Sequence, residues 1–293
     1  MALKVQEIYL HIGPHKTAST YLQQHIFNQL EGLEYYGPTA DITKKLHPKN
    51  YNISDENAGP VNVDELNSLA INNKVLISSE NWFGEHNLGY QNRFSNCDII
   101  KKLIPAAKII IIIRKQDDWL KSLYKQNIQK GSYFSFEDFV AKFGFDDNPF
   151  DVIDNYINNF GKENIHIIPY EKLLADSDKF MSDMASVLGY SNRLVSVNHF
   201  SNKSVNDNLL GINRSINYFL YILFGSDRSN LNKYTRKIIQ FYISPLFDKL
   251  PHSKKQLSVK KDQFKNILRR AEPYNRILDK EFNLNLTEYG YYE

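Results

Sequence analysis

Cysteine is almost absent from this chain: its 293 residues contain a single one, Cys97. One thiol allows no intramolecular disulfide and no cysteine-based zinc site. We interpret Cys97 as a semi-buried core residue rather than a nucleophile. The N-terminal residues are few and polar and lead directly into an apolar segment, which is unlike a secretory signal. Together these features predict a cytoplasmic protein.

Long hydrophobic runs and a strong excess of one charge are missing as well. The longest apolar runs, residues 109–113 and 218–224, are too short to span a bilayer. A formal net charge of +3 is too small for a dedicated nucleic-acid binder. We therefore expect no transmembrane segment and no nucleic-acid partner. Peripheral contact with a membrane stays open, and so does a local cationic pocket for a phosphorylated ligand.

Short apolar segments alternate with helical patterns along much of the chain. Buried strands are predicted at residues 7–12, 74–78, 108–113 and 165–168. Helices are predicted after the first and third strands and at residues 136–143 and 152–160. Such alternation predicts an α/β fold, a three-layer domain with a central parallel sheet covered on both faces.

Local signals refine this prediction. Leu22, Ile26 and Leu30 recur at helical spacing, and Asp117 or Asp118 is a suitable N-cap for the helix after the third strand. Residues 39–59, rich in Pro, Asn and Gly, predict a flexible insertion. From about residue 209 the pattern is helical to the end. Within it, residues 218–224 favour a buried helix over an apolar wall for an acceptor or a membrane-touching face.

Polar residues with the chemistry of an anion site follow the predicted strands. Ligands bind beyond the carboxyl ends of parallel strands, and there the sequence places Glu80, Arg114 and a loop made of Gly13, Pro14, His15, Lys16, Thr17, Ala18, Ser19 and Thr20. The loop offers backbone N–H groups at a helix start, a lysine and several hydroxyls, the ingredients of an anion cradle. A polar strand-to-helix turn with an N-capping serine is the alternative. It is not a Walker A loop, which requires glycine where Ala18 stands and lysine where Ser19 stands.

The segment from Lys16 to Gln23, KTASTYLQ, resembles the 5′-phosphosulfate loop of sulfotransferases that use PAPS (3′-phosphoadenosine 5′-phosphosulfate), with Ala18 in place of the usual glycine. Arg114 and Ser122, eight positions apart, are similar to the second signature of that family. Gln116 and Trp119 depart from its commonest form, which has proline and arginine there. Residues 165–174 and 180–189 resemble two later family segments. The resemblance covers roughly residues 5–205.

This resemblance implies a P-loop-type fold with PAPS as donor and PAP as product. It assigns His15, Lys16, Thr17, Ala18, Ser19 and Thr20 to the 5′ end of the nucleotide. Arg114 and Ser122 are implied to grip the 3′-phosphate, unless Arg114 forms a surface ion pair with Asp117 or Asp118. Lys203 is expected to add charge at the same phosphate, unless its segment is a solvated turn. We expect one domain, residues 1–293, with the PAPS-binding core at 5–205 and a helical part at 206–293.

Lys16 and Glu80 are the predicted catalytic residues. Sulfuryl transfer resembles phosphoryl transfer, so Lys16 would neutralise the leaving phosphate while Glu80 takes the proton of the acceptor hydroxyl. The glycan-modifying branch of the family, which this bacterial-type sequence resembles, uses a glutamate at this strand end. A histidine, His15 or His86, is the alternative base.

The favoured function is O-sulfation of a carbohydrate or glycolipid hydroxyl, with the acceptor pocket formed by residues 39–62, 83–94 and the C-terminal helices. No metal is implied, because lysine and arginine carry the charge balance and Arg114 stands where a magnesium-binding strand end would have aspartate. A P-loop kinase or other ATP-dependent phosphotransferase remains a rival. So does a non-catalytic module that binds PAPS or a glycan.

Overall fold

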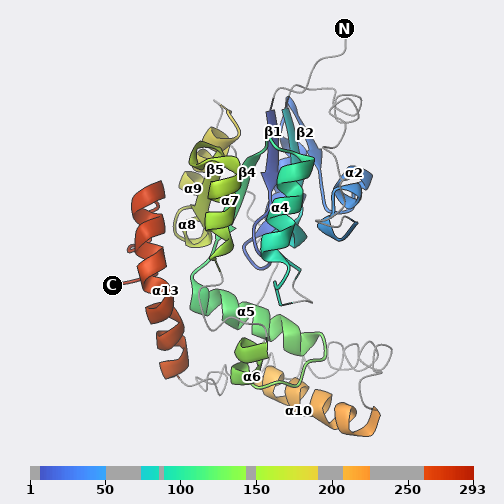
Figure 1. Cartoon of the computed structure of the whole chain (residues 1–293). Coiled ribbons are helices and arrows are strands. Elements are labelled where there is room, and N and C mark those ends of the chain that lie inside the picture. Colours follow the sequence, from blue (N-terminus) through green and yellow to red (C-terminus); the bar gives the residue numbers. More distant parts are fainter. Residues whose placement is uncertain (1–6, 51–73, 86–88, 143–149, 191–206, 225–260) are drawn as a thin grey trace.

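The computed structural model of the protein describes residues 7–50, 74–85, 89–142, 150–190, 207–224 and 261–293. Its centre is a sheet of five parallel strands in the order β2-β3-β1-β4-β5 (Figure 1). The strands are β1 (Glu7–His11), β2 (Leu33–Tyr36), β3 (Lys74–Ser78), β4 (Lys108–Ile113) and β5 (Ile165–Pro169). The four predicted strands are therefore confirmed. The edge strand β2 escaped prediction because only Leu33 in it is buried, so it lacks an apolar run.

Helices cover both faces of this sheet. The described α-helices are α1 (Ser19–His25), α2 (Asp41–Lys45), α4 (Arg93–Leu103), α5 (Gln116–Gln129), α6 (Phe136–Lys142), α7 (Val152–Phe160), α8 (Tyr170–Ala175), α9 (Ser177–Val187), α10 (Asp207–Phe224) and α13 (Lys261–Phe282). Short 3₁₀ helices are η1 (Phe27–Gln29), η2 (Pro48–Asn50), η3 (Glu80–Trp82) and η5 (Lys162–Asn164). None of the described helices is both long enough and apolar enough to cross a membrane.

The hydrophobic core lies in two layers because strand side chains alternate between the two faces. In β4, Ile109, Ile111 and Ile113 pack toward α4 and α7, whereas Ile110 and Ile112 pack toward α1 and α9. All five isoleucines are fully buried. The predicted three-layer α/β arrangement is therefore correct, and Figure 1 shows α4 and α7 in front of the sheet. Cys97 on α4 is also fully buried, and burial raises its pKa to about 12, so it is a core thiol.

Two predictions about the first part of the chain need correction. The helix after β1 is shorter than predicted: α1 ends before Ile26, whose backbone is not helical (φ −120°, ψ −60°), and a 3₁₀ turn follows. Leu22, Ile26 and Leu30 are nevertheless all buried, so the apolar spacing was a correct signal for packing. The predicted flexible insertion contains α2 and η2, and Ile42 is buried in the core. Residues 51–59 of that insertion lie outside the described part of the chain.

The predicted N-cap of α5 is also wrong. Lys115, not Asp117 or Asp118, precedes the helix. Its backbone N–H donates to a carboxyl oxygen of Glu171 at 2.9 Å, so the cap-residue amide is satisfied from α8. Asp117 and Asp118 lie within the first turn, where negative charge is favourable because of the helix dipole.

Residues 218–224 do not form the buried helix that was favoured. They are the C-terminal end of α10, and the exposed fractions of Phe219, Ile222 and Leu223 are 59%, 62% and 54% among the described residues. Among the side chains of this stretch that the structure describes, residues 218–223, only that of Leu220 is buried. The helix is amphipathic, and the contiguous apolar run conceals this because both faces carry apolar residues at this end.

Candidate active site

The carboxyl ends of β1, β3 and β4 bring the predicted functional residues to one edge of the sheet. β1 lies between β3 and β4 in parallel register, with His11 opposite both Ser78 and Ile110. The loop after β1, Glu80 after β3 and Arg114 after β4 therefore meet where strand order switches sides, the expected position for a ligand in an open parallel sheet. Helix α5 runs beyond these strand ends (Figure 1).

The loop after β1 has a tightly constrained backbone. A Cβ on Gly13 would lie 3.3 Å from the backbone nitrogen of Ile112 and from the hydroxyl of Thr17, so the loop approaches β4 closely. The buried Thr17 hydroxyl donates to the carbonyl of Pro14 at 2.6 Å and closes the loop on itself. Lys16 and Ala18 adopt left-handed conformations (φ 71° and 67°), which are unfavourable for residues with a Cβ. Strain of this kind persists where surrounding structure enforces it, and it is frequent at functional sites.

No serine caps the helix that follows this loop. Ala18 is the N-cap residue of α1 and no side chain caps the helix start, so the alternative of a serine-capped turn is incorrect. Ser19 is buried within the first turn, and Thr20 is exposed. The conformation leaves backbone N–H groups at the start of α1 without a side-chain acceptor, which is a favourable arrangement for an anion.

Lys16 and Glu80 form an electrostatically coupled pair. Burial lowers the pKa of Lys16; the charge of Glu80 opposes this effect, and Lys130 and Arg114 reinforce it. Burial raises the pKa of Glu80, while Ser19, Lys16 and Lys130 counteract it. The Ser19 hydroxyl is close enough to influence the carboxyl but makes no hydrogen bond of normal geometry. The pKa of each group is thus shifted in the direction that favours its neutral form. Shifts of this kind are frequent among catalytic residues.

His15, one of the alternative bases, lies beside Glu80. Its Nε2 is 3.9 Å from Oε2 of Glu80, and its Nδ1 is hydrogen-bonded to the hydroxyl of Tyr90 at 2.9 Å. The carbonyl of His15 accepts a hydrogen bond from the indole of Trp119 at 2.8 Å. His15 therefore does more than line the loop, because it joins Tyr90, Trp119 and Glu80.

Arg114 lies against the same loop from the side of β4. One Nη1–H donates to the carbonyl of Lys16 at 3.1 Å, and the guanidinium stacks on the Tyr170 ring at 4.8 Å. Its Nε is buried and has no hydrogen-bond partner among the described residues. The alternative ion pair with Asp117 or Asp118 is not formed; those carboxylates lie 3.8 Å and 3.4 Å from the amine of Lys115.

The two departures from the family signature have structural roles. Gln116 is fully buried and exchanges two hydrogen bonds with Asn275 of α13, at 2.6 Å and 3.1 Å. Trp119 is fully buried beside Tyr90 and Phe150 while its indole holds the His15 carbonyl. Gln116 therefore holds α13 in place, and Trp119 holds the loop.

The remaining predicted residues are less well defined. Ser122 lies within α5, partly buried, and no described side chain hydrogen-bonds to it. Lys203 and His86 lie outside the described residues. Lys130, at the C-cap of α5, was missed although its charge acts on both Lys16 and Glu80. No local motif marks it, because it reaches the site only through the length and direction of α5.

Comparison with known proteins identifies the family. The profile of the Sulfotransferase family matches residues 12–192, more than half of the chain. The protein belongs to the sulfotransferase family. A solved structure of a sulfotransferase from Alicyclobacillus acidocaldarius is similar, with a TM-score of 0.47 and 16% sequence identity over 76% of this chain and 98% of that chain. No curated protein matches the sequence significantly. The loop after β1, Glu80 and Arg114 all lie within the residues that the family profile matches.

Proposed function

We propose that this sulfotransferase uses PAPS as donor and transfers the sulfuryl group to an acceptor hydroxyl, on a carbohydrate or glycolipid of the kind modified by the glycan branch. The observation that carries the proposal is the convergence of Lys16, Glu80 and Arg114 on one sheet edge. Each comes from a different strand end, and each is electrostatically linked to another member of the group. Lys16 and Arg114 supply positive charge that can bind a nucleotide, and Glu80 supplies a carboxylate that can accept a proton.

The residues fit a donor with two anionic ends. Lys16 and the uncapped backbone N–H groups at the start of α1 suit the 5′ end of the nucleotide. Arg114 suits the 3′-phosphate: its buried Nε lacks a described partner, and its stacking on Tyr170 holds the guanidinium plane in one orientation. Ser122 and Lys203 are proposed to add a hydroxyl and a second charge there. His15, Thr17, Ala18, Ser19 and Thr20 shape the loop around the 5′ end.

Bound PAPS supplies a sulfuryl group and a phosphate that leaves in line with the attacking hydroxyl. Lys16 stabilises the negative charge that grows on the leaving oxygen. Glu80 takes the proton of the acceptor hydroxyl, and its raised pKa makes it a stronger base than an ordinary carboxylate. Lys16 and Glu80 each favour the charged form of the other, because Glu80 raises the pKa of Lys16 and Lys16 lowers the pKa of Glu80.

His15 is proposed to position Glu80 rather than to act as the base. Burial keeps the pKa of Tyr90 well above its usual value, so its hydroxyl retains its proton and can donate it to Nδ1 of His15. In the tautomer that this hydrogen bond would select, the proton of the imidazole lies on Nε2, the nitrogen that faces Glu80. A nitrogen that bears a proton cannot accept one, so the carboxylate is the available base.

The decisive experiment measures transfer of labelled sulfate from PAPS to a panel of glycans, glycolipids and phenols. Calorimetry with PAP against ATP-Mg separates the proposal from a P-loop kinase, because only the PAPS-dependent enzyme prefers the ligand with a 3′-phosphate. Rates with and without EDTA add a second check, since cationic side chains already surround the proposed donor. Activity that EDTA abolishes and magnesium restores would favour the kinase. PAP binding with no transfer to any acceptor would favour a non-catalytic module.

We also propose that the whole chain is one domain. Gln116 and Asn275 join α5 to α13, and the Tyr291 hydroxyl donates to Glu171 at 2.8 Å. Both contacts cross between the core and the C-terminal helical part. Limited proteolysis tests this proposal: one cooperative loss of the intact chain is expected, and a stable fragment lacking α13 would contradict it.

A further inference from the structure

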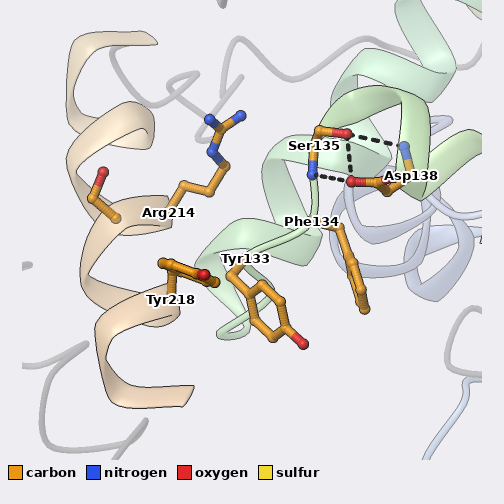
Figure 2. A pocket seen from close by; sticks show the side chains of 7 residues that line it. Tyr133, Phe134, Ser135, Asp138, Arg214 and Tyr218 are labelled. Atoms are coloured by element: carbon orange, nitrogen blue, oxygen red, sulfur yellow. Dashed lines mark hydrogen bonds between the residues drawn. The ribbon is translucent and has the colours of Figure 1, made fainter. Parts of the chain in front are cut away.

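A cavity outside the strand-end site lies between α10 and the turn that precedes α6. It has a volume of about 360 Å³ and is lined by Tyr133, Phe134, Ser135, Asp138, Arg214, Ser215 and Tyr218. Figure 2 shows Arg214 and Tyr218 on the α10 side and the other labelled residues on the opposite side. We refer to these seven residues as the helical pocket. Its volume is at the lower end of the range of about 300–1,000 Å³ typical of small-ligand sites.

The helical pocket has a polar end and an aromatic end. In Figure 2, Arg214 extends toward the end of the pocket that holds Ser135 and Asp138, whereas the rings of Tyr218 and Tyr133 lie toward the other end and Phe134 lies beside Ser135. The ring of Tyr133 is 5.7 Å from that of Tyr218 and 4.9 Å from that of Phe134, and it stacks on Tyr221 at 4.5 Å, so Tyr133 is held within an aromatic cluster and one of its faces is covered. A ligand that fits must therefore present a flat apolar face and polar groups at one side.

Arg214 is the cation among the residues that line the helical pocket, and Asp138 is the carboxylate. Arg214 is partly buried, and no described carboxylate pairs with it. Asp138 has another partner, since one of its oxygens accepts the Ser135 hydroxyl at 2.7 Å in a capping arrangement at the start of α6. The pocket thus offers a guanidinium for an anionic group and a second carboxyl oxygen for hydroxyl donors.

The helical pocket is tied to the strand-end site through α5. Asn217 of α10 donates to the carbonyls of Ile128 and Ser132 at 2.9 Å and 2.8 Å, which fixes α10 on the last turn of α5. Lys130 lies in that turn, three residues before Tyr133, and its charge reaches Lys16 and Glu80. The end of α5 thus connects the helical pocket with the strand-end site.

We infer that the helical pocket is the acceptor subsite for a sugar ring that carries an anionic group, a carboxylate or a sulfate. This inference rests on the proposed function. The C–H face of the sugar lies on the exposed Tyr218 ring, which the aromatic cluster around Tyr133 supports. Its anion pairs with Arg214, and its hydroxyls donate to Asp138. The hydroxyl to be sulfated belongs to a neighbouring ring nearer to Glu80. A small phenol has neither the anion nor the row of hydroxyls that these polar residues would bind.

The test uses two tetrasaccharides that differ only in charge: one with uronate carboxylates and its carboxyl-reduced neutral counterpart. Sulfation is measured with the full-length enzyme, Arg214→Ala, and the matched control Arg269→Ala, which removes an exposed arginine of α13. We expect Arg214→Ala to raise KM for the acidic sugar about ten- to a hundredfold, the usual effect of losing a charge-assisted bond. For the neutral sugar, and for Arg269→Ala with either sugar, we expect less than about a fivefold change.

A second readout keeps the inference independent of catalysis. Saturation-transfer NMR with the acidic tetrasaccharide alone is expected to show contact for the wild type and loss of contact for Tyr218→Ala. PAP affinity should be unchanged in both pocket variants, which also reports that they fold. Equal effects of Arg214→Ala on the two sugars, or transfer only to phenols, would overturn the inference while the sulfotransferase proposal stands. Failure of the wild type to bind PAP would instead refute the proposed function.

The same acidic sugar can be soluble or the headgroup of a glycolipid. Exposed Phe219 and Ile222 continue from the pocket along α10, where a lipid surface would meet them. Rates of Phe219→Ser/Ile222→Ser are therefore compared on the soluble tetrasaccharide and on a glycolipid with that headgroup in phosphatidylcholine vesicles. If the double variant loses activity only on the vesicles, the acceptor is a membrane glycolipid. If its rates equal those of the wild type on both substrates, the acceptor is a soluble sugar. The pocket binds the sugar in both cases.

Discussion

The strand-end site and the helical pocket place chemistry in opposite ways. In the strand-end site, His15, Lys16, Glu80 and Arg114 each follow a buried strand within a few residues, so parallel pairing alone brings them together. In the helical pocket, Arg214 and Tyr133 come from distant segments that meet because Asn217 holds α10 on the end of α5. Backbone geometry fixes the first site, whereas side-chain packing fixes the second. Substitutions in the strand-end site should therefore change the turnover or the donor affinity. Substitutions in the helical pocket should change which acceptor is preferred.

The largest expected effects separate the roles within the strand-end site. Glu80→Gln keeps the shape of the side chain but cannot take a proton, so we expect turnover to fall about 10²–10⁴-fold. Lys16→Ala is expected to lower turnover about 10²–10³-fold and to weaken PAP binding as well. PAP affinity of Glu80→Gln, measured by calorimetry, should stay near wild type.

His15 and a nearby carboxyl provide the controls for that experiment. His15→Asn should reduce turnover less than Glu80→Gln does, because His15 positions the base. Glu85→Gln, five residues further along, should have little effect. If His15→Asn abolishes turnover while Glu80→Gln retains it, the base is the histidine and the comparison with the glycan branch loses its support.

The pH profile of kcat/KM sharpens the assignment further. Glu80 must be deprotonated, and burial raises its pKa, so activity should fall on the acidic side at a higher pH than for an ordinary carboxylate. Lys16 must be protonated, and burial lowers its pKa, so activity should fall on the alkaline side below the usual range of lysine. On each side of the profile, kcat/KM should fall by about tenfold for each pH unit. An acidic limb that persists in Glu80→Gln would assign it to another group.

Arg114→Ala tests whether the strand-end site reads the 3′-phosphate. Losing one charge-assisted contact costs about 1.5–3 kcal/mol, so PAP affinity in calorimetry should fall about ten- to a hundredfold. Adenosine 5′-phosphosulfate, which lacks that phosphate, should lose much less, and only because Arg114 also holds the Lys16 carbonyl. Equal losses for both ligands would contradict the assignment, and Arg269→Ala is the charge-matched control.

Asn275→Leu breaks the link between the strand-end site and the helical part. It leaves the buried Gln116 amide and the Tyr291 carbonyl without partners, so the free energy of unfolding should fall by about 2–3 kcal/mol. Adding Gln116→Leu removes the unsatisfied amide and should recover part of that loss. Urea denaturation measures both variants. A single-variant loss below about 0.5 kcal/mol, the usual size for a surface substitution, would show that this pair does not join the two parts.

The smallest expected effect concerns backbone strain in the loop after β1. Ala18 has a left-handed backbone (φ 67°), so Ala18→Gly should raise the free energy of unfolding by up to about 1 kcal/mol. Ala185→Gly, in the last turn of α9, should lower it by about 1 kcal/mol because glycine is a poorer helix former than alanine. Denaturation midpoints compare the two. A loss at Ala18 similar to that at Ala185 would mean that the loop does not store strain.

The apolar pattern of the sequence predicts the parallel sheet and the residues at its edge. Five isoleucines in β4 can only be buried on both faces, and Lys16, Glu80 and Arg114 follow strands that the apolar pattern marks directly. It did not reveal β2, which is mostly polar, or the contact of His15 with Glu80, since a histidine in a loop has no pattern of its own. Predicted roles for Ser122 and Lys203 stay predictions.

Tertiary structure alone decided which side chains act on the site from a distance. Lys130 affects Lys16 and Glu80 because α5 runs beyond the strand ends, and Tyr218 lies beside Tyr133 because α10 packs on that helix. Likewise, only the packing shows that Gln116 contacts α13 and that Trp119 contacts the loop after β1. Strand ends impose local rules that a sequence displays, whereas helix packing joins residues whose separation along the chain carries no signal.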